Sequence, residues 1–160
     1  MRPPEIVQAQ LEALGLGIQV LEFADVSTAT AAQAAEAVGA ELGSIVKSLL
    51  FLAAAQPVRV LMAGDRQADQ RKIADHLGVS KKKVKIADAE TVRRVTGFEV
   101  GGVPPLAHAT PDLPVLIDAS LGRYETVYAA AGASNALFPI PFATLVEVTH
   151  GDVRDLARAE

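Results

Sequence analysis

The sequence predicts a single domain of the α+β class that spans residues 1–160. Half of the residues are hydrophobic, but only 4% are aromatic and tryptophan is absent, so Ala, Val, Leu and Ile must form most of the core. Segments in which apolar residues alternate, as in strands, are interspersed with segments of helical periodicity. At 160 residues the chain can bury roughly two thirds of the surface that its unfolded form exposes.

Composition excludes several classes of function. The net charge of -4 argues against a broad basic surface for nucleic acid, so we expect no DNA partner, although local basic patches remain open. The absence of cysteine excludes disulfides, thiolate nucleophiles and cysteine-ligated zinc. The three histidines, His76, His108 and His150, have no metal-ligand spacing, so we expect no metal and no other cofactor.

No apolar run approaches the length of a membrane span, and the N-terminus lacks the apolar core of a signal peptide. We therefore expect a soluble, cytoplasmic protein with no membrane partner.

The first third of the chain predicts helix, strand and helix. A helix begins at Pro3 and ends before Gly15, and residues 18–23 alternate as a strand. Thr30 and Gln33 have the spacing of a capping box, which opens an alanine-rich helix that ends near Gly39.

Residues 44–52 predict a buried strand with a lysine at its centre. Ile45, Lys47 and Leu49 share one face, and the opposite face is also largely apolar. A buried ammonium group without a partner is costly. Lys47 therefore either extends its head to solvent, pairs with an internal carboxylate, or faces a ligand in a pocket.

A second strand over residues 58–63 follows after a short connection, so we expect it to pair antiparallel with the lysine strand. The turn Gly64-Asp65-Arg66 comes next, before a helix from Asp69 to Leu77. Asp65 and Arg66 either line a site at the strand end or form an ordinary turn with its ion pair.

Lys81, Lys82 and Lys83 form the one concentrated positive run. Such a run is usually a solvated turn, but it could also contact a phosphodiester backbone. Asp88 then has the position of an N-cap for a short helix that ends at Gly97.

The segment 98–105, with Gly101-Gly102 followed by Val103-Pro104-Pro105, combines open backbone N–H groups with a fixed extended path. It is either a tight turn or a loop that holds a carbonyl or hydroxyl by main-chain donors. Further strands are predicted over 113–118, 126–130 and 145–148, and the tail from Gly151 is either a strand or a frayed helix.

Taken in order, these motifs resemble the YbaK/ProX family, the free-standing relatives of the editing domain of bacterial prolyl-tRNA synthetases. The resemblance covers about residues 6–148. It is carried by Ile45-Val46-Lys47-Ser48-Leu49, Gly64-Asp65-Arg66, the segment 96–105, Val115-Leu116-Ile117-Asp118 and Ala131-Gly132-Ala133-Ser134-Asn135.

The resemblance implies a mixed, mostly antiparallel sheet curled towards a barrel with helices packed outside. It also implies hydrolysis of the ester between a wrong amino acid and the 3′ end of tRNA, with prolyl-tRNA synthetase as a possible partner. In the family the strand lysine, here Lys47, is needed for deacylation, and the glycine loop, here Gly101 and Gly102, approaches the ester. We further expect Ser48, Asp65, Arg66, Val103, Pro104, Ser134 and Asn135 to bind substrate, and Lys81 to Lys83 to contact the tRNA.

An aminoacyl ester is already activated, so placing water and using the substrate's own ribose hydroxyl suffices, without a nucleophilic triad. Asn135 cannot act as a general base at neutral pH. The preferred function is a trans-acting deacylase for tRNA carrying a small wrong amino acid, tRNA-Pro with alanine or cysteine first. The alternatives are a non-catalytic module that binds tRNA, a synthetase or a nucleotide, and a small-molecule hydrolase or structural partner.

Overall fold

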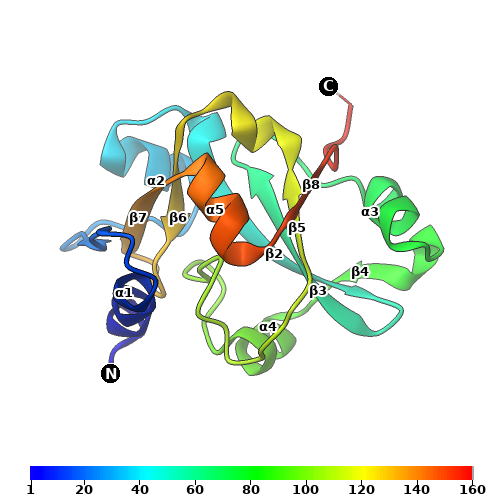
Figure 1. Ribbon diagram of the computed structural model, residues 1–160, viewed down its shortest axis with the longest axis horizontal. Coiled ribbons are helices and arrows are strands. Elements are labelled where there is room, and N and C mark those ends of the chain that lie inside the picture. The colour runs from blue at the N-terminus through cyan, green and yellow to red at the C-terminus, as the bar shows by residue number, and fades with distance from the viewer. Residues whose placement is uncertain (160) are drawn as a thin grey trace.

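The computed structural model describes residues 1–159, which form one open mixed sheet flanked by helices (Figure 1). The strands are β1 (Leu21–Glu22), β2 (Ile45–Ala53), β3 (Gln56–Ala63), β4 (Val84–Ile86), β5 (Val115–Asp118), β6 (Thr126–Ala130), β7 (Ala136–Pro141) and β8 (Asp152–Arg154). Their order is β1-β7-β6-β2-β3-β5-β8, and β4 also pairs with β2. The pairings β1–β7, β2–β3, β2–β4 and β6–β7 are antiparallel, and the others are parallel. The predicted α+β class and mixed sheet are confirmed.

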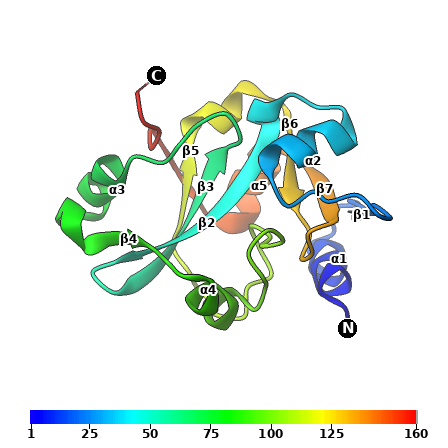
Figure 2. The same ribbon diagram turned by 180° about the vertical axis from the view of Figure 1, so that it is seen from behind.

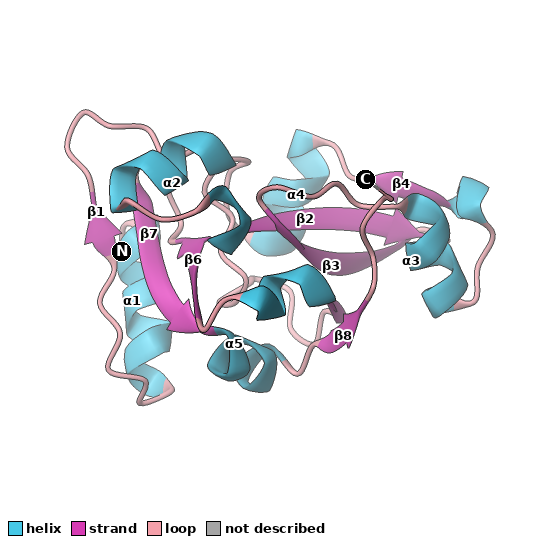
Figure 3. Ribbon diagram, turned by 90° about the horizontal axis from the view of Figure 1, so that it is seen from above, coloured by secondary structure: helices cyan, strands magenta, loops and turns pink. Residues whose placement is uncertain are grey.

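Helices cover both faces of the sheet (Figures 1 and 2). They are α1 (Pro3–Ala13), α2 (Ala31–Val38), α3 (Gln70–Leu77), α4 (Ala89–Thr96) and α5 (Phe142–Thr149), with short 3-10 turns η1 (Leu42–Ser44), η2 (Lys81–Lys83) and η3 (Ala119–Arg123). The largest apolar cluster joins α1, α4 and α5 to one face, and α2 and α3 pack on the other. Seen from above, β7 and β6 lie towards one end and β3 and β4 towards the other (Figure 3).

Three helix starts follow from local chemistry that the sequence shows. Thr30 accepts from the backbone N–H of Gln33, and the Gln33 side chain accepts from the backbone of Thr30. Asp69 caps α3 and Asp88 caps α4 through their carboxylates. The predicted capping box at Thr30 and the predicted cap at Asp88 are confirmed, and Asp69, predicted as the first residue of a helix, is the N-cap of α3.

The prediction of a strand over residues 145–148 is wrong, because these residues belong to α5. Leu145, Val146 and Val148 all pack on the main core, which a helix achieves and an alternating strand does not. Their branched side chains suggested a strand, but burial against the sheet decides the helix.

The strands β4 and β7 are not predicted, and the predicted strands over 18–23 and 113–118 are too long. Only Leu21 and Glu22 of the predicted strand 18–23 pair, with β7. β7 contains Pro139 and Pro141, which argue against a strand in sequence. They are tolerated because β1 pairs only with residues 136 and 137, so the prolines lie where that edge of β7 has no partner strand.

Within residues 1–159, no helix has the length and apolar character needed to cross a membrane.

Candidate functional site

The central strand β2 is unpaired along part of one edge. Its other edge pairs with β3 over its whole length. On the first edge, β6 pairs with residues 45 and 46, and β4 pairs with residues 51–53. Residues 47–50 therefore have a strand partner only in β3.

The direction of the backbone groups in this gap follows from two hydrogen bonds. Gly64 N donates to Ile45 O on the β3 side, and Ala87 N donates to Leu50 O on the opposite side. Along an antiparallel strand, the N–H and C=O of one residue point to the same edge, and those of the next residue point to the opposite edge. The N–H and C=O of Ser48 therefore point into the gap.

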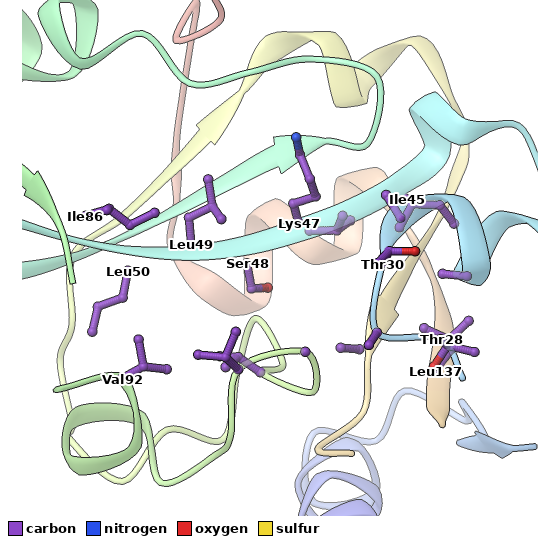
Figure 4. Close-up of a pocket in the computed structure, with 18 of the residues that line it drawn as sticks. Thr28, Thr30, Ile45, Lys47, Ser48, Leu49, Leu50, Ile86, Val92 and Leu137 are labelled. Atoms are coloured by element: carbon purple, nitrogen blue, oxygen red, sulfur yellow. The ribbon is translucent and has the colours of Figure 1, made fainter. Parts of the chain in front are cut away.

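A cavity of about 410 Å³ occupies this gap (Figure 4). One wall comes from the segment before α2, from α2 itself and from Leu137 of β7, and the opposite wall comes from Ile86, Ala87 and Val92. Gly101 and Val103 also line the cavity, and Gly101 lies against Ala29 of the segment before α2. The lining is mostly apolar, with Lys47 and a few hydroxyl groups as its polar elements.

Lys47 and Ser48 leave β2 in opposite directions (Figure 4). The Lys47 ammonium donates to the carbonyl of Arg66. Burial lowers the pKa of Lys47, and the charge of Asp65 opposes that shift. Among residues 1–159, no carboxylate forms an ion pair with Lys47. The prediction that an internal acid holds this lysine is not met, and the ammonium can receive an anion.

Asp65 and Arg66 are not among the residues that line the cavity. They belong to the turn whose Arg66 carbonyl accepts from Lys47. The Asp65 carboxylate accepts two hydrogen bonds from Arg123, at 2.7 and 3.0 Å, and one from Arg66 at 3.1 Å. The side-chain hydrogen bond from Arg123 lowers the pKa of Asp65. The structure therefore favours the turn with its ion pair over direct substrate contact for these two residues.

Two hydroxyl groups from residues that line the cavity have no protein partner. They are Thr28 Oγ1 and Ser48 Oγ, and both are buried. A buried hydroxyl without a hydrogen bond is costly, so such groups usually bind water or a ligand. The gap thus contains an ammonium group, a strand edge and two hydroxyls.

The two glycines of the 98–105 loop have different surroundings. Gly101 lines the cavity with a φ of 94°. Gly102 packs on the loop after β6, where a Cβ would lie 2.7 to 2.8 Å from the backbone of Ala133. Gly132 N also donates to Gly102 O at 2.8 Å. Gly102 is therefore needed for the contact between the loops and does not itself line the cavity.

Pro104 is buried behind the loop, where Arg59 donates to its carbonyl and His108 lies close to both groups. His108 Nε2 lies 2.8 Å from Pro104 O and 3.0 Å from Arg59 Nη1, and Arg59 Nη2 donates to Pro104 O at 3.3 Å. One ring nitrogen cannot donate to the carbonyl and accept from the guanidinium together. Since Arg59 is charged and fully buried, its guanidinium is best satisfied when the neutral ring accepts from Nη1.

The electrostatics of this pair agree with a neutral histidine. Burial lowers the pKa of Arg59 to about 9, so it stays charged at neutral pH. Burial, and then the charge of Arg59, lowers the pKa of His108 to about 4. This pair cannot be predicted from local sequence, because residues 59 and 108 meet only through the fold.

Ser134 and Asn135 also lie away from the cavity lining. Ser134 O accepts from Thr28 N at 2.6 Å, and Asn135 Nδ2 donates to Phe23 O at 3.0 Å. Both residues hold the segment 23–28, which carries Thr28 into the cavity wall. Ser134 and Asn135 thus hold a segment of the cavity wall and do not line the cavity themselves.

Lys81, Lys82 and Lys83 form η2 and are all exposed. They precede β4, whose last residue, Ile86, lines the cavity. The residues 1–159 contain no group of His, Cys, Asp and Glu side chains suited to a metal ion.

Comparison with known proteins identifies the class. Residues 25–148 match the family model of the aminoacyl-tRNA editing domain. The chain belongs to this family, and the predicted resemblance is confirmed.

Two curated relatives illustrate the range of the family. The uncharacterized protein YwhH of Bacillus subtilis is 36% identical over 137 residues, which cover 84% of this chain and 83% of that protein. The proline–tRNA ligase of Desulfovibrio desulfuricans is 36% identical over 98 residues, which cover 61% of this chain but 16% of the ligase. The chain thus spans about one sixth of the length of that synthetase.

Among solved structures, a candidate trans-editing enzyme for prolyl tRNA synthetase superimposes with a TM-score of 0.91 and 39% identity. The superposition covers 99% of each chain. The similarity therefore extends over the whole fold, including the strands that frame the gap in β2.

Proposed function

We propose that this protein is a trans-acting aminoacyl-tRNA deacylase, which hydrolyses the ester between a wrong amino acid and the 3′ end of a tRNA. Membership of the editing family and the similarity to a free-standing candidate editing enzyme support the proposal. The observation that carries it is the gap in β2. There an ammonium group that forms no ion pair with a carboxylate of residues 1–159 lies beside a mostly apolar cavity of about 410 Å³.

Lys47 would bind the phosphate of the terminal adenosine. A phosphate would supply an acid partner that residues 1–159 do not provide, and it would favour the charged ammonium against the burial that lowers its pKa. The carbonyl of Arg66, itself positioned by the turn after β3, holds the ammonium in place.

The reaction itself needs little from the protein. A water molecule attacks the ester carbonyl carbon, the bond from that carbon to the ribose oxygen breaks, and the ribose oxygen leaves with a proton. The neighbouring ribose hydroxyl of the substrate would carry that proton. The Ser48 N–H and the backbone of Gly101, which both line the cavity, would hold the carbonyl oxygen as charge develops on it.

The amino acid removed would be small. The end of the cavity formed by α2, β6 and β7 is lined by Ala31, Ala34, Ala130 and Leu137, which leave no acid or base to pair with a charged side chain. Alanine and cysteine on tRNA-Pro are the first substrates to test, with prolyl-tRNA synthetase as a candidate partner in the cytoplasm. The exposed Lys81 to Lys83 run would contact the tRNA backbone beyond the cavity.

The test is a panel of mischarged tRNAs, including Ala-tRNA-Pro and Cys-tRNA-Pro, with release of the amino acid as the readout. We expect hydrolysis of at least one small aminoacyl ester by the wild-type protein and no comparable hydrolysis by Lys47→Met. Binding of tRNA without turnover would instead identify a non-catalytic module of the same fold. No release across the whole panel would contradict the proposed activity.

A further inference from the structure

A second cavity of about 280 Å³ lies beside the first. Lys47, Leu49 and Ile86 line both cavities, so the two share a wall. The remaining lining residues of the second cavity are Phe51, Gln67, Ala68, Gln70 and Arg158. This cavity lies on the Lys47 face of β2, between β4, α3 and the C-terminal segment.

The second cavity has the chemistry of a nucleotide site. Among the described residues that line it, the two charged side chains, Lys47 and Arg158, are both cationic, and none is an acid. Gln67 and Gln70 provide amide donors and acceptors, and the rest is apolar. Cations suit phosphate, apolar surface suits the face of a base, and amides suit its hydrogen-bonding edge.

Arg158 is fixed in place by three hydrogen bonds. Its backbone N–H donates to Gln67 O at 2.8 Å, its Nε donates to Ala68 O at 3.2 Å, and its Nη1 donates to Gln67 Oε1 at 3.0 Å. These bonds place a guanidinium at the cavity from a part of the chain beyond residue 148, where the family match ends.

The segment that carries Arg158 is itself anchored. Lys72 donates to the Asp155 carboxylate at 3.0 and 3.1 Å and to Ala157 O at 2.7 Å. Leu156 N donates to the buried carboxylate of Asp118 at 2.8 Å. A guanidinium held this firmly loses little side-chain freedom when it binds an anion.

We propose that the second cavity binds the nucleotide that precedes the terminal adenosine of the tRNA, an inference that rests on the proposed deacylase function. Lys47 lies in the shared wall, where the phosphate linking the two nucleosides would cross from one cavity to the other. The base would pack on Ile86, whose side chain is 60% exposed on β4. Gln70 would bind the edge of the base, and Arg158 would bind the next phosphate.

The test compares the equilibrium binding of two ligands that are not hydrolysed. Adenosine 5′-monophosphate offers one nucleoside and its phosphate, whereas cytidylyl-(3′→5′)-adenosine adds the preceding nucleoside. Stacking and edge contacts of one base are worth about 1–3 kcal/mol, so we expect the dinucleotide to bind at least about fivefold more tightly. Titration calorimetry measures the ratio of the two dissociation constants.

The ratio should fall in Gln70→Ala, because the base keeps its packing on Ile86 but loses its edge contact, and Arg158→Ala should lower the affinity for a dinucleotide that carries a 5′-phosphate. Gln19→Ala and Arg154→Ala are matched controls, because both residues are exposed and line neither cavity. The ratio should stay at its wild-type value in both controls.

A wild-type ratio near one, failure of the dinucleotide to bind at millimolar concentration, or an unchanged ratio in Gln70→Ala would overturn the second site. The outcome is separable from the proposed activity. If the protein hydrolyses mischarged tRNA but the ratio of the two dissociation constants is near one, only the proposed nucleotide site is rejected. If the ratio is high but no tRNA in the panel is hydrolysed, the dinucleotide site stands and the proposed deacylase activity is rejected.

Discussion

Replacing Lys47 by methionine tests the site with little change to the fold. Methionine keeps a side chain of similar length for the apolar contacts of β2 and removes only the ammonium group. The lysine is partly exposed and its pKa is lowered by burial, so the folded protein disfavours its charge.

The stability of the variant should be close to that of the wild type. Removing the ammonium relieves the burial of a charge but loses the hydrogen bond to Arg66 O, whose net worth is about 0.5–1.5 kcal/mol. These effects oppose each other. We expect the free energy of unfolding to change by about 1 kcal/mol or less.

The activity should change far more. A hydrogen bond between a charged group and phosphate is worth about 1.5–3 kcal/mol, which corresponds to a loss of about tenfold to more than a hundredfold in kcat/KM. The assay is release of the amino acid from the best substrate of the panel, beside urea unfolding of each variant. Arg154→Met removes an exposed cation of β8 and serves as the control.

A Lys47→Met variant that stays within twofold of the wild type in kcat/KM would refute the proposed role of the ammonium. A variant that unfolds but retains its activity per folded molecule would show that Lys47 is structural.

Three further changes test the surroundings of the site. Gly102→Ala should lower the free energy of unfolding by about 1–3 kcal/mol, because the new Cβ would lie 2.7 to 2.8 Å from Ala133; thermal unfolding measures it. The pKa of His108 is about 4 in the folded protein against 6.5 as its ordinary value. The unfolded chain therefore binds the proton first, and stability should fall by up to about 3 kcal/mol as the pH drops from 6.5 to 4. Lys82→Ala should raise KM for tRNA about two- to threefold, leave kcat unchanged and reduce the salt dependence of binding.

A specific result would contradict each of these three predictions. Wild-type stability in Gly102→Ala would show that the two loops do not pack as described. His108→Gln keeps an acceptor for the buried guanidinium but does not titrate, so this variant should lose less stability as the pH drops from 6.5 to 4. The control His150→Asn should lose as much stability as the wild type. If His108→Gln loses as much stability at low pH as the wild type, the loss belongs to another group. Kinetics of Lys82→Ala equal to wild type at low salt would exclude the lysine run as a tRNA contact.

Local chemistry in the sequence predicted the parts of the fold that local chemistry determines. The caps at Thr30 and Asp88 depend on residues three positions away, and the alternation around Lys47 depends on neighbours along one strand. β7 and α5 could not be predicted in the same way. Their prolines and branched residues have the opposite local preference, which the sheet edge and the core override.

The site was predictable only in its central residues. Lys47 stood out because a charge in an apolar strand needs an explanation, and Gly101 because of its place in the loop. Thr28, Ile86 and Arg158 come from three distant segments that the sheet brings together, and nothing in their local sequence indicates a site. Asp65, Ser134 and Asn135 were expected at the substrate, but their hydrogen bonds hold the segments that form the site.

The most direct test is a crystal structure with a non-hydrolysable aminoacyl-adenosine analogue in which an amide replaces the ester. The phosphate should lie within hydrogen-bond distance of Lys47 Nζ, and the amide carbonyl should face the unpaired edge of β2 at Ser48. An analogue bound away from residues 47–50, or with its phosphate in solvent, would contradict the claim that the gap in the sheet is the substrate site.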